Sequence, residues 1–158
     1  MSSAPSFAAI LPAPFGTLGV LASAERLFTL AFLAPGTVLS APTSPLLEQV
    51  AAQLDAYYAN PRHRFELPIE ARGSDFRLRV WQALLDIPSG HTSTYGELAR
   101  RLGSSARAVG QALGDNPLPI VIPCHRVLAA HGLGGFNHAC DGHALDVKRW
   151  LLRHEGVL

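Results

Sequence analysis

Two consecutive sets of helix start and stop signals in the second half of the chain constrain its fold most strongly. Thr94-x-x-Glu97 is a capping box, and it predicts a helix that runs through Leu102. A Gly-Ser-Ser turn at 103–105 ends that helix and begins a second one over residues 106–113. Two short helices joined by such a turn predict a helix-turn-helix. On its own this pattern is weak evidence for DNA binding.

Two further helices are predicted on either side of this pair. An apolar stripe from Phe76 to Ile87 predicts a helix that stops at Pro88. The last helix is expected over residues 144–155, followed by Gly156. One face of it is predicted to carry Leu145, Lys148, Leu152 and Glu155.

Between the paired helices and the last one, the sequence favours extended chain. The apolar run Ile120-Val121-Ile122 is bracketed by prolines and is expected to be extended. Residues 126–129 and 133–136 flank His131-Gly132, which predicts a second hairpin or wing.

The first half of the chain predicts a small sheet with a helix. Apolar runs at 18–23 and 27–33 are typical of a hairpin, and Ser44-Pro45 marks the start of an amphipathic helix. Residues 60–73 are expected to be a linker. The predicted fold is therefore α/β (α+β), with a sheet-plus-helix domain over 1–70 and a mostly helical domain over 73–158.

Composition and charge limit the classes of function. Of 158 residues, 48% are hydrophobic and 16% charged, which is typical of a folded globular protein. The formal net charge is only +1, which excludes a protein that binds DNA through a broad basic surface. Local binding through a few arginines and a groove of matching shape stays open.

The chain carries no signal of export or membrane insertion. Its start has no basic segment and is interrupted by prolines, and no apolar run reaches eighteen residues. Cys124 and Cys140 are the two cysteines. Without an export signal they indicate a reducing compartment, so we expect a cytoplasmic protein without a structural disulfide.

The segment Pro123-Cys124-His125-Arg126-Val127 contains the strongest candidate for chemistry. A cysteine becomes a nucleophile when a base or a positive neighbour favours its thiolate, and His125 and Arg126 are both such neighbours. In extended chain adjacent side chains point to opposite faces, so His125 reaches Cys124 only through a turn or a water. A buried structural cysteine beside an unrelated histidine is the alternative.

The wider pattern resembles the O6-alkylguanine-DNA alkyltransferases. The matching motifs cover roughly the second half of the chain, from about Gly73 to the C-terminus. They are Phe76-x-x-x-Val80-Trp81, Ile87-Pro88-x-Gly90-x-Thr92-x-x-Tyr95-Gly96-x-Leu98-Ala99, Arg107-Ala108-Val109-Gly110, Asn116-Pro117-x-Pro119, Pro123-Cys124-His125-Arg126-Val127 and Lys148-Arg149-Trp150-Leu151-Leu152-x-His154-Glu155-Gly156.

The resemblance implies a catalytic role for several residues. Cys124 matches the alkyl acceptor, His125 the base that takes its proton through a water, and Glu155 the carboxylate that orients the base. Asn116 matches the amide that holds the turn near the cysteine. Tyr95 matches the phenol that assists the departing guanine.

The resemblance also implies how the base is held. Lys148 is expected to stabilise the charge that develops on the departing guanine. The main-chain carbonyls of Val127 and Cys124 would accept hydrogen bonds from the amino group of that guanine. The reaction needs no cofactor and no metal. Because a thioether does not readily leave, each molecule should act once.

The resemblance implies a monomer whose partner is double-stranded DNA. This DNA would carry O6-alkylguanine or, as a further substrate, O4-alkylthymine. Arg107 matches the arginine that fills the space of a flipped nucleotide. Ala108 and Gly110 would permit close approach from the minor groove, and Thr94 is a further expected DNA contact.

One segment departs from the family pattern. Residues 135–145 are about five residues longer than usual, and Phe136 replaces the usual tyrosine. The donors that would hold the O6 atom therefore cannot be assigned. His138-x-Cys140-x-x-His143, with Asp141, has the spacing of metal ligands, although a surface loop without bound metal is the favoured interpretation.

Three other functions compete with alkyl transfer. A non-catalytic module that binds alkylated guanine and recruits other repair proteins would hold the lesion without a covalent product. A winged-helix regulator would prefer a DNA sequence and would tolerate loss of Cys124. A cysteine hydrolase would need turnover and an oxyanion site, which the sequence does not reveal.

Overall fold

The computed structural model describes residues 6–139 and 142–158 and shows a mixed α/β fold. The chain divides into two compact units, Met1–Glu70 and Ala71–Leu158. Among the described residues, no helix is both long enough and apolar enough to cross a bilayer.

The first unit contains a three-stranded antiparallel sheet in the order β1-β2-β3. The strands are β1 (Ala9–Ala13), β2 (Gly16–Ala22) and β3 (Leu27–Leu33). The predicted hairpin of β2 and β3 is confirmed. The sequence predicts no strand over β1 because Pro12 interrupts it, but β1 lies at the edge of the sheet, where a proline is tolerated.

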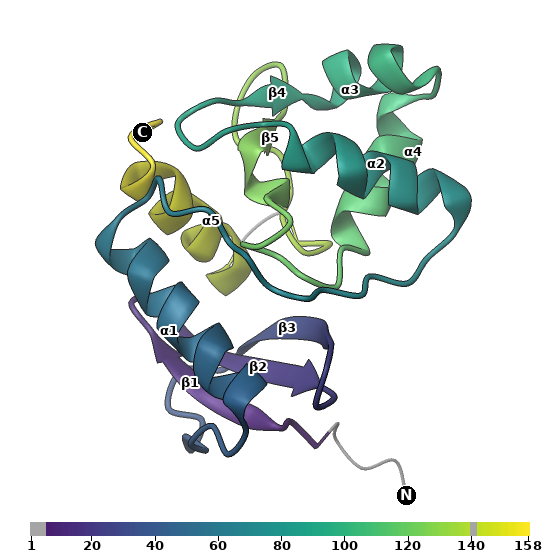
Figure 1. The fold of residues 1–158 in the computed structure, drawn as a ribbon. Coiled ribbons are helices and arrows are strands. Elements are labelled where there is room, and N and C mark those ends of the chain that lie inside the picture. Colours follow the sequence, from purple (N-terminus) through teal and green to yellow (C-terminus); the bar gives the residue numbers. More distant parts are fainter. Residues whose placement is uncertain (1–5, 140–141) are drawn as a thin grey trace, which may run out of the picture. The chain divides into compact units, whose positions relative to one another are not determined.

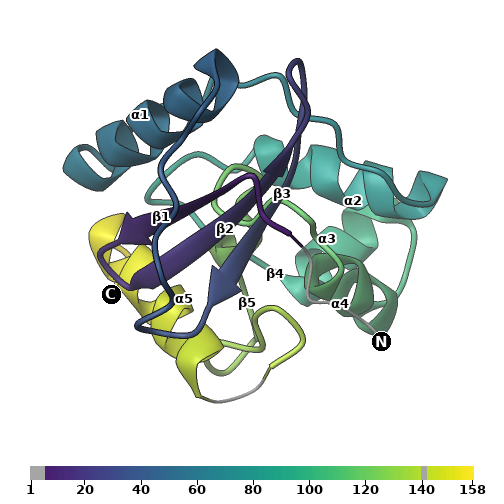
Figure 2. The same ribbon diagram turned by 90° about the horizontal axis from the view of Figure 1, so that it is seen from below.

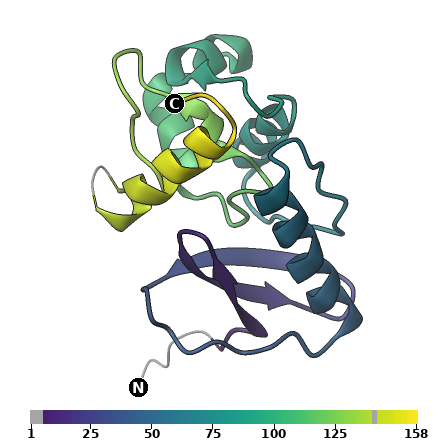
Figure 3. The ribbon, with the colours of Figure 1, turned by 90° about the vertical axis from the view of Figure 1, so that its left-hand side faces the viewer.

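One helix, α1 (Pro45–Ala59), lies on one face of this sheet (Figures 1 and 3). As predicted, Ser44 caps it, since its hydroxyl accepts from the Leu47 amide and Pro45 occupies the first turn. The buried face of α1 consists of Leu46, Leu47, Val50, Leu54 and Tyr57. This helical spacing of apolar residues closes the core of the first unit.

The predicted linker is only partly a linker. Its residues form no helix, but Ile69 bridges Leu27 in parallel, and Leu27 exchanges backbone hydrogen bonds with Pro68 and Glu70. The Gln53 side chain also bonds the Glu66 backbone in both directions. The segment up to Glu70 is therefore fastened to the first unit.

The helices predicted for the second unit are confirmed. They are α2 (Asp75–Leu85), α3 (Tyr95–Leu102), α4 (Ala106–Gly114) and α5 (His143–His154). Thr94 and Glu97 form the predicted capping box, and Gly103 ends α3 in the left-handed conformation. The indole of Trp81 donates to the Ala112 carbonyl at 2.8 Å, which ties α2 to α4.

The segment that contains Cys124 runs between α5 on one side and α2, α3 and α4 on the other (Figures 1 and 2). It comprises a 3-10 turn, η1 (Cys124–Arg126), and a short strand, β5 (Val127–Leu128). The predicted second hairpin is mostly wrong, because β5 pairs in parallel with β4 (Ser93–Thr94). Only a single bridge joins Ala129 to Gly132.

The expected extended run at 120–122 is also wrong. Ile120 adopts a positive φ of 76°, and the Ile122 amide bonds the Leu118 carbonyl, so the chain turns here. A β-branched residue is strained in this conformation. Ile120 and Ile122 are apolar because they are buried in this turn, not because they belong to a strand.

Candidate active site

Asn116 holds the turn that leads to Cys124. Its side-chain amide donates to the Ile122 carbonyl at 2.8 Å, and its carbonyl oxygen accepts from the Leu118 amide at 3.0 Å. The side chain therefore spans the turn from both of its polar ends, and it is buried. Asn116 also hydrogen-bonds Cys124 itself.

Cys124 is buried and lines a pocket of about 460 Å³. Burial raises the pKa of its thiol to about 11, while the Asn116 hydrogen bond and the charge of Lys148 partly oppose this shift. At neutral pH the sulfur is therefore a thiol. It needs a base to become a nucleophile.

His125 lies next to Cys124 in the turn η1 and is fully buried. Its Nε2 lies 2.8 Å from Oε2 of Glu155. Burial lowers the pKa of this imidazole, and Glu155 partly opposes the shift. An ionised carboxylate only accepts, so Nε2 carries the proton and Nδ1 has the free lone pair of a base. Nδ1 has no hydrogen-bond partner within the described part of the chain.

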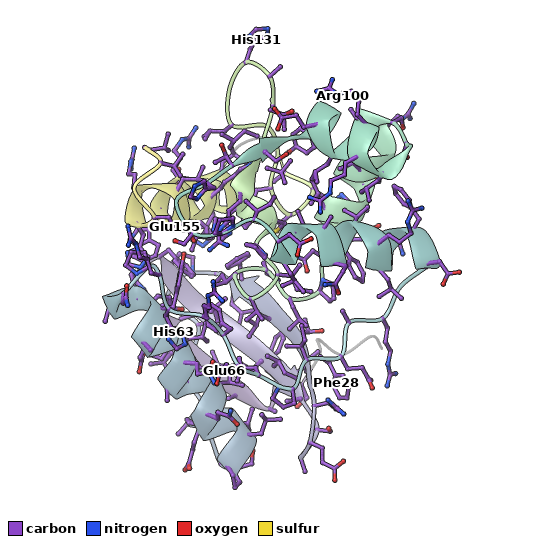
Figure 4. All side chains as sticks on the ribbon, turned by 45° about the horizontal axis from the view of Figure 1, so that its top comes forward. Phe28, His63, Glu66, Arg100, His131 and Glu155 are labelled. Atoms are coloured by element: carbon purple, nitrogen blue, oxygen red, sulfur yellow. The ribbon has the colours of Figure 1, made fainter. Side chains whose placement is uncertain are left out.

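The sequence indicates Arg126 only as a positive neighbour of Cys124, whereas in the structure Arg126 binds the Glu155 carboxylate. Its guanidinium donates to both oxygens of Glu155, at 2.8 and 3.0 Å, and to the Ile87 carbonyl at 2.6 Å. The carboxylate is therefore fixed by Arg126 on one side and by His125 on the other (Figure 4 labels Glu155 beside the C-terminal helix). The sequence signal is the position of Arg126, directly after the histidine.

Lys148 is buried on α5, on the face that it is predicted to share with Leu145, Leu152 and Glu155. Its ammonium group donates to the carbonyls of Val127 at 2.8 Å, Leu133 at 2.6 Å and Gly135 at 2.9 Å. Burial lowers the pKa of Lys148 to about 8, with Cys124 opposing the shift. Because Val127 already accepts from Lys148, a bound base would have to share its carbonyl.

Tyr95 begins α3 and lines the same pocket as Cys124. Its hydroxyl donates to the Gly135 carbonyl at 3.3 Å. The phenol is therefore held at the pocket wall, where it can donate to a group that enters.

The helix α4 forms another side of the pocket, which includes Arg107 and Gly110. Arg107 is exposed in the first turn, and a side chain added at Gly110 would meet open space. Ala108 is half-buried beside them but does not line the pocket. Thr94 is not among the residues that line the pocket. Its hydroxyl accepts from the Glu97 amide in the cap of α3.

The longer segment forms the remaining side of the pocket, through residues 135–139. Phe136 is buried there, and His138 hydrogen-bonds Asp115, which is not a member of the suggested ligand set. Cys140 and Asp141 of the suggested ligand set lie outside the described residues. Within the described residues, no group of three potential ligands could hold a metal ion.

These features define a class: a protein with a buried cysteine, a neighbouring histidine in contact with a buried carboxylate, and a pocket lined by that cysteine and by one of a pair of short helices. Two family models match the chain. The DNA binding domain of 6-O-methylguanine DNA methyltransferase matches residues 75–157, and its ribonuclease-like domain matches residues 7–71. The chain belongs to the 6-O-methylguanine DNA methyltransferase family.

Individual relatives agree with this assignment. The methylated-DNA–protein-cysteine methyltransferase of Methanosarcina acetivorans is 35% identical over 156 residues, which cover 94% of this chain and 97% of that protein. The enzyme of the same name from Mycobacterium tuberculosis is 47% identical over 106 residues, 65% of this chain and 61% of that protein. The crystal structure of Mycobacterium tuberculosis OGT in complex with DNA matches with a TM-score of 0.78 and 37% identity, covering 93% of this chain and 91% of that chain.

Proposed function

We propose that this protein repairs DNA by moving the alkyl group of O6-alkylguanine onto Cys124, once per molecule. The observation that carries this proposal is the buried chain of contacts from Glu155 to His125 beside Cys124 in a pocket-lining turn. The relatives named methylated-DNA–protein-cysteine methyltransferases support the same reaction.

The proposed step is a direct displacement at the alkyl carbon. His125 takes the thiol proton at Nδ1 through a water, and the sulfur forms a bond to carbon while the bond from carbon to O6 breaks. The electron pair of that bond goes to the guanine, and the thioether stays on Cys124. Glu155 stabilises the imidazolium, and Arg126 keeps the carboxylate ionised and in place.

The leaving guanine needs a hydrogen-bond donor or a proton. Tyr95 lines the pocket and can turn its hydroxyl from Gly135 toward the base. Lys148 places a positive charge near Cys124, which favours the developing negative charge in a site with little water. No cofactor takes part in this scheme.

DNA binding is proposed for the helix pair α3 and α4, used as a helix-turn-helix by a monomer. A stacked guanine cannot present its O6 substituent to a buried sulfur, so the base has to be flipped out. Arg107 is exposed at the pocket and is the proposed residue that enters the base stack, with Ala108, Gly110 and Thr94 near the backbone. O4-alkylthymine would enter by the same route.

The test is the mass of the intact protein and of its peptides after incubation with a short duplex that contains O6-methylguanine. We expect one methyl group on the peptide that holds Cys124, with one lesion lost per protein molecule. Cys124→Ser should abolish the mass gain and retain binding to the lesion duplex, because the hydroxyl is a far weaker nucleophile.

The same measurement separates the rival functions. An unmodified wild-type protein that still binds the lesion duplex selectively would overturn transfer and favour a recognition module. A sequence preference without a lesion preference would indicate a transcription regulator. Repeated turnover would contradict the single use of Cys124.

A further inference from the structure

One wall of the pocket is a tight hairpin whose shape is set by its own backbone. Phe136 and Ala139 exchange two backbone hydrogen bonds of 2.9 Å. Between them, Asn137 and His138 have positive φ values of 52° and 62°, as in a two-residue type I′ turn. We call residues 135–139 the wall hairpin.

The tip of the wall hairpin is fastened to the end of α4. His138 Nε2 lies 2.7 Å from Oδ1 of Asp115, and the other oxygen of Asp115 accepts from Arg77 at 2.5 Å. The imidazole of His138 lies directly on Gly114, where an added Cβ would come within 2.3 Å of the ring. Gly114 therefore makes room for His138 by having no side chain.

The base of the wall hairpin is fastened separately. The Gly135 carbonyl accepts from Lys148 at 2.9 Å and from Tyr95 at 3.3 Å. Phe136 lies between the two fastenings, buried, and lines the pocket together with Cys124. The base of the wall hairpin is hydrogen-bonded to Lys148 and Tyr95. The hydrogen bond from His138 to Asp115 is therefore the contact whose loss would let the tip of the wall hairpin move.

We infer that His138 is a positioning residue which holds the wall hairpin closed and so limits the size of the alkyl group that reaches Cys124. This inference rests on the function proposed above. His138 lines the pocket itself, and its hydrogen bond to Asp115 acts through the position of Phe136. Its side chain is 49% exposed and that of Asp115 29%, so the bond can open without unfolding the second unit.

The experiment compares transfer from two matched duplexes, one with O6-methylguanine and one with O6-benzylguanine. In His138→Ala we expect the ratio of the benzyl to the methyl rate constant to rise about threefold to tenfold, the net effect of one ordinary hydrogen bond. Amide exchange at Phe136 and Ala139 should accelerate in the same variant. His138→Gln, which can still donate to Asp115, should keep the ratio within about twofold of wild type.

A second variant disturbs the hydrogen bond between His138 and Asp115 by a change in α4 instead of in the wall hairpin. Gly114→Ala places a methyl group where the His138 ring lies, and it should raise the ratio as His138→Ala does. Added to His138→Ala, it should have no further effect, because the ring is already gone. His143→Ala is the matched control at the other end of the same segment, and it should leave both rate constants unchanged.

The outcomes separate the two proposals. An unchanged ratio in both His138→Ala and Gly114→Ala, or an equal change in His143→Ala, would overturn the role of His138 while methyl transfer by wild type upholds the proposed function. If wild type places neither alkyl group on Cys124, the proposed function fails and the inference falls with it.

Discussion

The two units bury cores of different kinds. In the first unit no Asp, Glu, Lys or Arg side chain is buried among the described residues, and the buried Thr17 hydroxyl donates to main-chain carbonyls. In the second unit the buried polar residues are Asn116, His125, Lys148 and Glu155. These surround Cys124, or contact a residue that does.

The difference separates what stabilises the fold from what prepares the reaction. Apolar burial stabilises a core without directional constraint. Buried charges cost free energy unless each is paired, and removal of one partner leaves the other uncompensated. The second unit therefore holds its reactive groups in fixed positions at a cost that the first unit does not have.

The largest expected effect is that of Lys148→Met. The carbonyls of Val127, Leu133 and Gly135 would lose the Lys148 ammonium group, so we expect the free energy of unfolding to fall by about 3–5 kcal/mol and alkyl transfer by about 100-fold or more. Urea unfolding and the rate of mass gain measure the two effects. Arg62→Met, at an exposed position, should change stability by less than about 0.5 kcal/mol. Equal effects of the two substitutions would remove the contrast between the units.

Glu155→Gln tests the orientation of the base. The amide keeps the shape of the side chain but leaves Arg126 without its ionic partner and His125 without a carboxylate. We expect a loss of stability of about 3 kcal/mol and a transfer rate about 100-fold lower. Glu48→Gln on α1 is the exposed control. A fully active Glu155→Gln protein would show that His125 needs no carboxylate.

Val50→Ala tests the first unit. Val50 is fully buried on α1, and removal of two methyl groups should lower the free energy of unfolding by about 2 kcal/mol. The rate constant of the folded protein should not change, because no charged group is disturbed. A severalfold slower transfer at a temperature where the variant is fully folded would mean that the first unit takes part in the reaction.

The pH dependence of transfer should give the smallest effect. The pKa of Lys148 is about 8, so its positive charge is lost above that pH, and we expect transfer to fall roughly tenfold between pH 7 and 9.5. A free thiolate as the nucleophile would give the opposite slope, since the pKa of Cys124 is about 11 and the thiolate fraction would still be rising. Single-turnover rates across this range distinguish the two.

The sequence predicts local structure well where the signals are local. The capping box at Thr94 and Glu97, the cap at Ser44 and the shared helix face of Lys148 and Glu155 all follow from spacing along the chain. Neighbouring residues decide these features, so no tertiary information is needed.

The failures involve contacts between distant residues. The strand at Val127 finds Ser93 as its partner, and Ile120 turns with a positive φ because the Asn116 side chain bonds on both sides of it. In the candidate site, the roles of Cys124 and His125 were expected from the family pattern, whereas the bond from His138 to Asp115 joins residues 23 positions apart and has no signal in the sequence.

The burial of Cys124 has a consequence for the lifetime of the unused protein. With a pKa of about 11, roughly one molecule in ten thousand carries a thiolate at pH 7, against a few per cent for an ordinary exposed cysteine. Diffusible oxidants and small electrophiles react with the thiolate form of a cysteine. Because almost no thiolate is present at Cys124, these reactions should be slow. Under the proposed single use of Cys124, this burial keeps the sulfur from random consumption until a substrate fills the pocket.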